Sequence, residues 1–533
     1  MPLRLLAVAL ISLLLTAAPP ARAGSLSPDL AAALESLPAG EELAVIAVIS
    51  GRPVLPSISE GSARERRRRI VSSLRTAART DLDPAATLAR SFGARTVRSL
   101  WLAHAIALRG TPEAITALAA QPGIDIIVPD YLVGLPGPRD VTKAAAFAPP
   151  GSPPEWNIAM VGAPKLWSRG ITGAGQVVAV LDTGIDATHP DLAGKNRPTY
   201  FWYDTQNTLN TTPIETDAAG AHGTGVTSLA LGGEAGGTAL GMAPDARWVA
   251  VRLLDDQQLA HFSNVIQGYA WLLDPDEDPG TDDAPGVVNN SWGFTEYVGQ
   301  CLETPFPLQE VLATMRAAGV AMVFAGGNYG PNPATSLPPA NVPGALAAGY
   351  LDVLQTIAPE SSRGPSPCDP PDTIYPELVG PGVNIRMADR MLVPGIPQYR
   401  YGNGSSFAAP HVAGAAALLR SALPSASLDQ VEAALLTSAV DLGEAGPDNV
   451  YGHGLLDVEK AYDLLLDATG ACRGDINLDG RADLKDLRLL RADWGRADCA
   501  DLGCAGDLNF DDAVDQADLD VFTADLHRTC PER

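Results

Sequence analysis

The sequence predicts an α/β protein whose central part is a parallel sheet flanked by helices. A smaller α+β domain is expected before it and a small all-α module after it. Near-continuous apolar runs, which suit strands buried on both faces of a parallel sheet, occur at 176–182, 247–254, 286–291 and 320–328. Segments with helical spacing, at 261–273 and 307–319, lie among them. Strands that alternate with helices in this way predict an α/β architecture.

The first part of the chain, residues 24–140, is predicted to fold as a separate α+β domain. Its strand-like runs lie at 42–50 and 124–132, and its helical patterns at 64–80 and 111–121. A stretch rich in Pro, Ala and Gly follows. We interpret residues 141–154 as an exposed linker of the kind that proteases cut.

Residues 1–23 have the pattern of a secretory signal peptide. Arg4 provides a positive start, an apolar core follows, and Ala21-Arg22-Ala23 forms a small-x-small cleavage site. The apolar run is shorter than the ~20 residues of a membrane-spanning helix, and no later segment is long and apolar enough to span. We therefore expect a secreted, extracellular protein that has no membrane attachment once the signal is removed.

Cysteine usage fits an oxidising compartment. Two cysteines lie in the middle of the chain, Cys301 and Cys368, and four near its end. In an exported protein an even number in each part predicts disulfides within each part. A zinc site made by the last four is the alternative, although their spacing, filled by acidic loops, is unlike that of zinc ligands.

Charge is unevenly spread along the chain. The net charge is −25, of which residues 1–150 carry +4, residues 470–533 carry −7 and the middle carries −22. A basic front and an acidic middle suggest two parts that attract each other, although solubility alone explains an acidic surface. An acidic body of this kind makes nucleic acid an improbable partner.

Polar residues follow several of the predicted strands. Functional groups of parallel sheets gather at the carboxyl ends of strands, where Asp182 and Asn328 stand. His222 begins a helix among small residues, and Ser405 and Ser406 precede an apolar helix. Taken singly, Asp182 could cap a turn and a serine could cap a helix.

Four sequence blocks together resemble the subtilisin-like serine peptidases. They are "VVAVLDTGIDATHPDL" around Asp182, "HGTGVTSLALG" from His222, "AGGN" ending at Asn328, and "GNGSSFAAPHVAGAAALL" around Ser406. "NNSWG", "SSRGPSPC" and "GPGVNIR" are most similar to the bacillopeptidase F-like branch. The resemblance covers residues 155–467 and implies a subtilisin-like fold.

The resemblance also implies the role of each residue. Ser406 would be the nucleophile, His222 the general base and Asp182 its orienting carboxylate, with Asn328 binding the oxyanion; no cofactor is needed for this catalysis. Residues Ser291, Trp292 and Gly293 would form a substrate-binding strand for protein or peptide substrates. We expect Pro410 to lie in the first turn of its helix, where a missing N–H costs nothing.

The same resemblance implies that residues 24–140 are an inhibitory propeptide, with residues 141–154 as the linker to the peptidase domain. Gly225 stands where relatives often have a second histidine, which is no member of the triad. The segment 232–244 is too short for the calcium loop of some relatives. A non-catalytic surface or binding protein that retains the peptidase fold is the alternative function.

Residues 471–530 contain a repeat whose two copies start 32 residues apart. Each copy begins D-x-N-x-D and continues with aspartates at loop positions nine and twelve. Oxygen ligands at one, three, five, nine and twelve, with the carbonyl at seven, can enclose Ca²⁺. The first loop offers Asp475, Asn477, Asp479, Asp483 and Asp486 with the Arg481 carbonyl. The second offers Asp507, Asn509, Asp511, Asp515 and Asp518 with the Ala513 carbonyl.

Aspartate at position twelve and a helix after each loop resemble type I dockerin repeats, which implies a cohesin-type protein partner. Gly480 stands at the sharp turn of the first loop, whereas Asp512 replaces glycine in the second. The left-handed conformation costs more for Asp than for Gly, so we expect weaker calcium binding there. A purely structural calcium clamp is the alternative role for this module.

Overall fold

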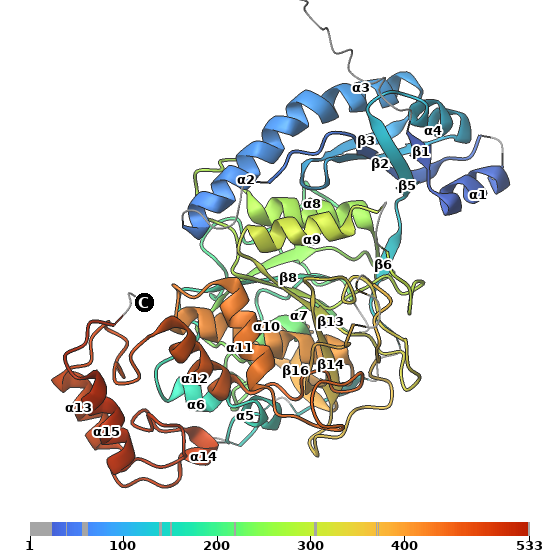
Figure 1. Cartoon of the computed structure of the whole chain (residues 1–533). Helices are drawn as coiled ribbons and strands as arrows, with labels where there is room; N and C mark the ends of the chain where they lie inside the picture. The colour runs from blue at the N-terminus through green and yellow to red at the C-terminus, as the bar shows by residue number, and fades with distance from the viewer. Residues whose placement is uncertain are drawn as a thin grey trace, which may run out of the picture.

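The computed structural model describes residues 24–530 except for the short segments 39, 56–61, 138–140, 146, 150–151, 218–219, 303–305, 369 and 371–372. The predicted signal peptide, residues 1–23, lies outside the described residues. Three bodies follow one another along the chain: an α+β domain at the top of Figure 1, a large α/β body below it, and a helical module at the lower left. Within the described ranges, no helix has the length and apolar character needed to cross a membrane.

The N-terminal domain is built on a five-stranded sheet. Its strand order is β1 (Ser25–Leu26), β5 (Ile124–Pro129), β2 (Leu43–Ile49), β4 (Ala105–Gly110) and β3 (Arg95–Leu100). Neighbouring side chains of β2 point to opposite faces. Val45 packs with α1 (Pro28–Ser36), α3 (Asp83–Ser91) and α4 (Pro112–Ala119), whereas Ile46 faces the central body.

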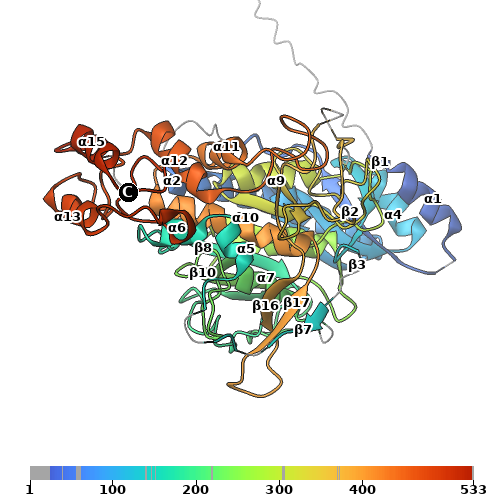
Figure 2. The ribbon, with the colours of Figure 1, turned by 90° about the horizontal axis from the view of Figure 1, so that it is seen from below.

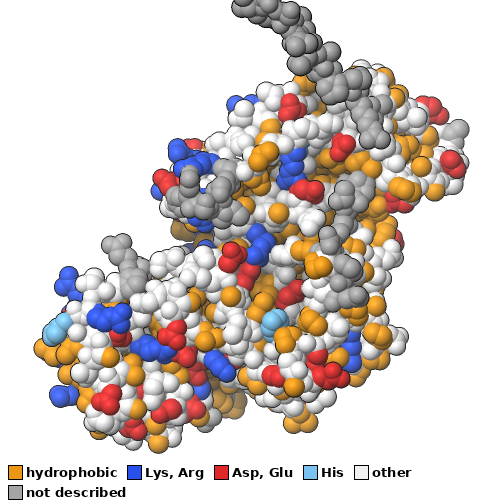
Figure 3. All heavy atoms as spheres, in the orientation of Figure 1, with side chains coloured by type: hydrophobic (Ala, Val, Ile, Leu, Met, Phe, Trp, Pro, Cys, Tyr) orange, Lys and Arg blue, Asp and Glu red, His pale blue; other side chains and the backbone are white. Residues whose placement is uncertain are grey.

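Helix α2 (Ala63–Ala77), which continues through a π-helical turn at Ala78–Leu82 into α3, packs against α9 (Leu308–Ala317) of the central body. Basic side chains gather near its start in Figure 3. Arg67 is buried there and forms an ion pair of 2.5 Å with Asp282, and Arg75 pairs with Asp274. The opposite charges of the two parts therefore meet at this interface.

A seven-stranded sheet forms the centre of the molecule, and all its neighbouring strands are parallel. The order is β15 (Leu378–Pro381), β14 (Leu346–Leu351), β13 (Ala321–Ala325), β12 (Val287–Asn290), β8 (Val177–Asp182), β10 (Arg247–Arg252) and β9 (Trp202–Asp204). The middle strands are almost entirely buried. The predicted parallel sheet is therefore confirmed, and helices cover both of its faces.

The helices lie in two layers. On one face α7 (His222–Leu231) and α10 (Ser405–Ala422) pack on the sheet, with α11 (Leu428–Ser438) and α12 (Val458–Thr469) beside them. On the other face lie α8 (Phe262–Leu273) and α9, between the sheet and the N-terminal domain. The layers bring the first residues of α7 and α10 to the end of the sheet where β8 and β13 finish.

Two small antiparallel sheets accompany the central sheet, one of two strands and one of three. β6 (Leu132–Gly134), which runs from the N-terminal domain into the central body in Figure 1, pairs with β11 (Leu259–His261). The hairpin of β16 (Ile385–Asp389) and β17 (Gln398–Gly402) projects in Figure 2, and β7 (Val141–Lys143) lies along β17. The first residues of the expected linker are thus a paired strand.

The C-terminal module consists of α13 (Leu484–Ala492), α14 (Cys499–Leu502) and α15 (Gln516–Asp525) around a small apolar core. All six cysteines lie in the described part of the chain, and they pair as Cys301–Cys368, Cys472–Cys530 and Cys499–Cys504. The prediction of disulfides within each part is confirmed. On the face seen in Figure 3, basic and acidic side chains are interspersed over this module.

The module docks on α6 (Ala163–Trp167) and the residue Arg169 after it, through α14 and its second acidic loop. The ammonium of Lys165 lies 2.7 Å from both Asp512 and Glu459, and the Arg169 guanidinium stacks 4.4 Å from the Phe510 ring centroid. Asp512 has a left-handed φ of +67°, like Gly480 at +84°. The ion pair with Lys165 offsets part of the conformational cost of aspartate at this position.

Candidate active site

Asp182 and His222 lie in direct contact. Asp182 is the last residue of β8, and His222 is the first residue of α7. The Nδ1–H of His222 donates to Asp182 Oδ1 over 2.8 Å, and both side chains are 1% exposed. A carboxylate only accepts hydrogen bonds when ionised, so this contact places the ring proton on Nδ1. It leaves the buried Nε2 of His222, which has no hydrogen-bond partner, free to accept a proton.

Ser406 is the second residue of α10 and is fully buried. α7 and α10 pack against each other, and the rings of His222 and Phe407 lie 5.7 Å apart. A hydroxyl at this place faces the partial positive charge of a helix N-terminus, which favours developing negative charge. The fold thus brings Ser406 to the same end of the sheet as Asp182 and His222.

Pro410 explains how Ser406 is held. It is the sixth residue of α10, so the expectation that it lies in the first turn is wrong. In a regular helix the N–H of residue 410 would donate to the carbonyl of Ser406. Proline has no N–H, and this carbonyl instead accepts a hydrogen bond of 3.0 Å from the Ser291 hydroxyl. The Ser406 hydroxyl in turn lies 3.4 Å from the Ser291 carbonyl.

Asn328 follows β13 and is held by Ser405. Its Oδ1 accepts hydrogen bonds of 2.9 Å from both the backbone N–H and the hydroxyl of Ser405. The Ser405 oxygen also accepts from the Gly327 N–H at 2.9 Å. With Oδ1 fixed, the Nδ2 of Asn328 points the other way and donates to the Pro136 carbonyl over 2.8 Å. No pattern in the sequence indicated that Ser405 orients this amide.

The segment Ser291–Gly293 lines a groove that β6 fills. Gly293 and Gly134 exchange two backbone hydrogen bonds of 2.9 Å, and β11 pairs with the other edge of β6. Trp292 turns its side chain away from the groove, fully buried and packed edge-on against Phe324. Of the predicted substrate-binding residues, Gly293 therefore contacts the bound strand and Ser291 contacts Ser406.

Glu215 is a buried carboxylate that sequence reasoning missed. Its oxygens accept from the hydroxyl of Thr183, the N–H of Asp217, and the N–H and hydroxyl of Thr224, all within 3.0 Å. Burial raises the pKa of Glu215 to about 7, and these hydrogen bonds oppose the rise. Because Thr183 follows Asp182 and Thr224 belongs to α7, Glu215 ties the Asp182 loop to the start of the His222 helix.

His411 has a structural role in α10. It is fully buried within α10, its Nδ1–H donates to the Phe407 carbonyl at 2.7 Å, and its Nε2 accepts from Asn157 Nδ2 at 2.7 Å. Burial lowers the pKa of His411 to about 4. A neutral imidazole satisfies both partners, so this histidine holds the helix that carries Ser406.

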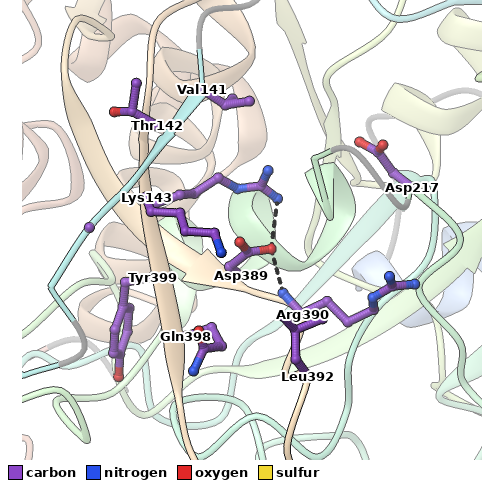
Figure 4. Close-up of a pocket in the computed structure, with 11 residues that line it drawn as sticks. Val141, Thr142, Lys143, Asp217, Asp389, Arg390, Leu392, Gln398 and Tyr399 are labelled. Carbon is purple, nitrogen blue, oxygen red and sulfur yellow. Dashed lines mark hydrogen bonds and ion pairs between the residues drawn. The ribbon is translucent and has the colours of Figure 1, made fainter.

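A cavity of about 370 Å³ is lined by residues of β7, of β17 and of the segment that follows β16 (Figure 4). Its wall mixes charges of both signs: Asp389 accepts from the Arg390 N–H at 2.7 Å and pairs with Arg400 at 3.3 Å, while Lys143 and Asp217 lie around it. Asp182, His222 and Ser406 do not line this cavity.

The two acidic loops of the C-terminal module have the same internal hydrogen bonds. Position one, Asp475 or Asp507, accepts from the N–H groups at positions five and six. Position twelve, Asp486 or Asp518, is fully buried and accepts from the N–H groups at positions three and nine. The repeat in the sequence is therefore a repeat in structure.

The loop residues suit a hard cation. The side-chain atoms that could bind a metal are carboxylate and amide oxygens. The buried carboxylates at positions one and twelve come from opposite ends of each loop. Lys485 competes in the first loop, where its ammonium lies 2.7 Å from Asp479. Among the described residues, the one tight group of His, Cys, Asp or Glu ligand atoms is Asp498, Cys499 and Cys504. Disulfides use both of these thiols and also those of Cys472 and Cys530. A zinc site at the last four cysteines is therefore excluded.

Comparisons of the sequence with known proteins match the chain to one family. Residues 173–454 match the model of the Subtilase family, Peptidase S8. The chain is 32% identical over 410 residues to bacillopeptidase F of Bacillus subtilis, covering 72% of this chain and 27% of that protein. It is 33% identical over 356 residues to an alkaline protease of Alkalihalobacillus alcalophilus, covering 66% of this chain and 77% of the relative. With subtilisin E of Bacillus subtilis the identity is 33% over 315 residues, covering 57% and 70%. The chain thus spans only about a quarter of the length of bacillopeptidase F.

Proposed function

The chain belongs to the subtilase family, and from that premise we propose that it is a subtilisin-like serine endopeptidase whose catalytic triad is Asp182, His222 and Ser406. The observation that carries this proposal is the contact of 2.8 Å between His222 Nδ1 and Asp182 Oδ1, which leaves the buried Nε2 unpartnered. An imidazole held in this way is ready to take a proton from a hydroxyl.

The mechanism follows from these contacts. His222 Nε2 takes the proton of Ser406 as its oxygen attacks the peptide carbonyl, and Asp182 stabilises the charged imidazole. The Nδ2 of Asn328 and the N–H of Ser406 bind the oxyanion. The imidazolium then protonates the leaving amine, and water hydrolyses the acyl-enzyme. Protein and peptide substrates bind through backbone pairing along Ser291–Gly293.

We propose further that the N-terminal domain, residues 24–140, is an inhibitory propeptide of an exported zymogen. Support comes from β6, which pairs with Gly293, and from Pro136 just after it, whose carbonyl contacts Asn328. The ion pairs of α2 with the central body also support it. A substrate cannot enter a groove that this strand occupies. The peptidase domain then corresponds to residues 155–467, and the signal pattern at residues 1–23 supports secretion.

For residues 471–530 we propose a dockerin-like module that binds Ca²⁺ in each loop and a cohesin-type protein partner. The ligands are those predicted from the repeat. Two observations support this proposal: the two loops share the same pattern of hydrogen bonds, and each contains buried carboxylates. A bound cation would neutralise the negative charge of these carboxylates. Asp182, His222 and Ser406 do not belong to these loops.

Active-site labelling of the secreted protein tests the catalytic proposal. A fluorophosphonate probe is expected to label the purified enzyme and abolish peptide hydrolysis, while Ser406→Ala is neither labelled nor active. Ser421→Ala is the matched control, because Ser421 lies on the same helix and its hydroxyl donates to the Leu418 carbonyl. A folded, unlabelled wild-type protein without hydrolysis would favour the alternative, a surface or binding protein that retains the fold.

A further inference from the structure

We infer that the zymogen cuts itself at the peptide bond between Pro136 and Gly137, so that the mature chain begins at Gly137. This inference rests on the proposed function, because it assigns the first substrate of the same site. It places the boundary before the expected end of the propeptide at residue 140.

The residues before this bond are held as a strand on both edges. Gly134 exchanges two hydrogen bonds with Gly293, and Val133 pairs with Ala260 of β11. Val133 is fully buried in the apolar cluster that also contains Ala260 and Phe294. These contacts fix the register, because a shift by one residue would turn Val133 out of its apolar surroundings.

With this register, the carbonyl of Pro136 is the one that reaches Asn328. Its oxygen accepts from Asn328 Nδ2 at 2.8 Å, and the next N–H, that of Gly137, donates to the Tyr329 hydroxyl at 3.2 Å. Among the described residues of this segment, Pro136 alone places its carbonyl on that amide. The bond that follows this carbonyl is therefore the bond presented to Ser406.

Gly137 fits this place for a steric reason. Its φ is +56°, and a Cβ added there would lie 3.0 Å from the Asn328 Cβ and 3.1 Å from the Asn328 carbonyl oxygen. A larger residue would press on the side chain that holds the oxyanion and would adopt a costly left-handed backbone. The sequence at the bond thus suits close approach to Asn328.

The chain is also held beyond the bond. β7 pairs with β17 from Val141 to Lys143, and β17 ends at Gly402, just ahead of α10. Both flanks of the bond belong to the same molecule as Ser406 and are anchored on strands beside it. Cleavage is therefore intramolecular.

The chemistry balances as an ordinary hydrolysis. Ser406 Oγ adds to the Pro136 carbonyl carbon, and its proton passes to His222 Nε2. The bond to Gly137 breaks, and the nitrogen of Gly137 takes that proton to become the new amino terminus. Water then hydrolyses the Pro136 ester, which gives a carboxylate on Pro136 and restores the Ser406 hydroxyl.

The test follows the first cut in the full-length precursor by intact mass and N-terminal sequencing. The earliest new terminus is expected at Gly137, with a first-order rate that does not change over a hundredfold dilution. Gly137→Val should slow this cut at least tenfold, whereas Ala145→Val, an exposed change eight residues further on, should not. Ser406→Ala should stay uncut.

The outcomes separate this inference from the proposed function. An enzyme that is labelled by the fluorophosphonate probe but makes its first cut at another bond, or cuts at a rate proportional to concentration, overturns the inference alone. A folded precursor that the probe never labels overturns the proposed triad. Normal processing of Gly137→Val at the wild-type rate also contradicts the assigned bond.

Discussion

The Oδ1 atom of Asn328 receives two hydrogen bonds of 2.9 Å from Ser405, one from its backbone and one from its hydroxyl. Asn328 lies three residues after the end of β13, and Ser405 is the first residue of α10. The contact therefore joins a strand to the helix that carries Ser406. It fixes the direction in which the Asn328 amide presents its N–H to a carbonyl in the groove.

Ser405→Ala is expected to reduce kcat about tenfold with little change in KM. The change removes one hydrogen bond to Asn328 Oδ1, a contact of ~1 kcal/mol. The amide that binds the oxyanion in the transition state is then held less firmly.

Ser405→Thr, which keeps the hydroxyl, should restore activity, and Asn328→Ala should lower kcat by about 10²–10³. The measurement is steady-state hydrolysis of a fluorogenic peptide. If Ser406→Ala were fully active and Ser405→Ala inactive, the nucleophile would be Ser405 and the assignment of Ser406 would be wrong.

Asp182→Asn is expected to lower kcat about 10⁴-fold while the protein stays folded, because an amide no longer fixes the proton of His222 on Nδ1. Asp352→Asn is the matched control: Asp352 also follows a strand of the same sheet and caps a turn through the N–H groups of Leu354 and Thr356. Rates are compared with equal amounts of probe-labelled enzyme. A loss of less than tenfold for Asp182→Asn would contradict the assigned role.

His411 should make the fold less stable in acid. Its pKa is about 4 in the folded protein against 6.5 ordinarily, so the unfolded chain binds the proton more readily between these values. The free energy of unfolding therefore falls as the pH drops from 6.5 to 4, by about 3 kcal/mol from this group.

Urea unfolding of inactive Ser406→Ala protein at several pH values measures this effect. A second change, His411→Gln, should lower stability overall but flatten its pH dependence by that amount, because glutamine does not titrate. His527→Gln, at an exposed position, should leave the pH dependence as it was. Parallel curves with and without His411 would show that the imidazole is not held neutral.

Calcium is expected to stabilise the C-terminal module of the full-length Ser406→Ala protein. At a hundredfold excess over Kd, one site contributes about 2.7 kcal/mol, which raises the midpoint of a domain of this size by about 10 °C or more. Asp475→Ala combined with Asp486→Ala should remove the first site's share. Asp507→Ala should remove less, because Asp512 strains the second loop.

Calorimetry with Ca²⁺ or with chelator follows the module's own transition. Asp498→Ala combined with Asp520→Ala, two carboxylates outside the loops, is the matched control for charge and should respond to Ca²⁺ as the parent protein does. Chelator should leave short-term peptide hydrolysis by the mature enzyme unchanged. If the midpoint temperature of the module's transition did not change with Ca²⁺, the module would not be a calcium-binding module but an appendage stabilised by its disulfides.

The local sequence predicted most elements for physical reasons that act within a few residues. The apolar runs at 176–182 and 320–328 became β8 and β13 because side chains buried on both faces are what a central parallel strand requires. The periodicity of the sequence could not show where α10 begins. Pro410 is its sixth residue, beyond the first turn in which backbone N–H groups lack a helical partner, and the first residue of the helix depends on tertiary contacts.

By itself, the sequence determined which groups could do chemistry and how the cysteines divide: Asp182 and Asn328 stand at strand ends, His222 and Ser406 at helix starts, and the acidic repeat has a fixed spacing. The tertiary structure decided which of them meet. Asn328 and Pro136 are 192 positions apart, and Asp512 meets Lys165 only because the module docks on α6. Contacts of this range depend on how whole layers pack, and packing is a property of the assembled chain that no local pattern encodes.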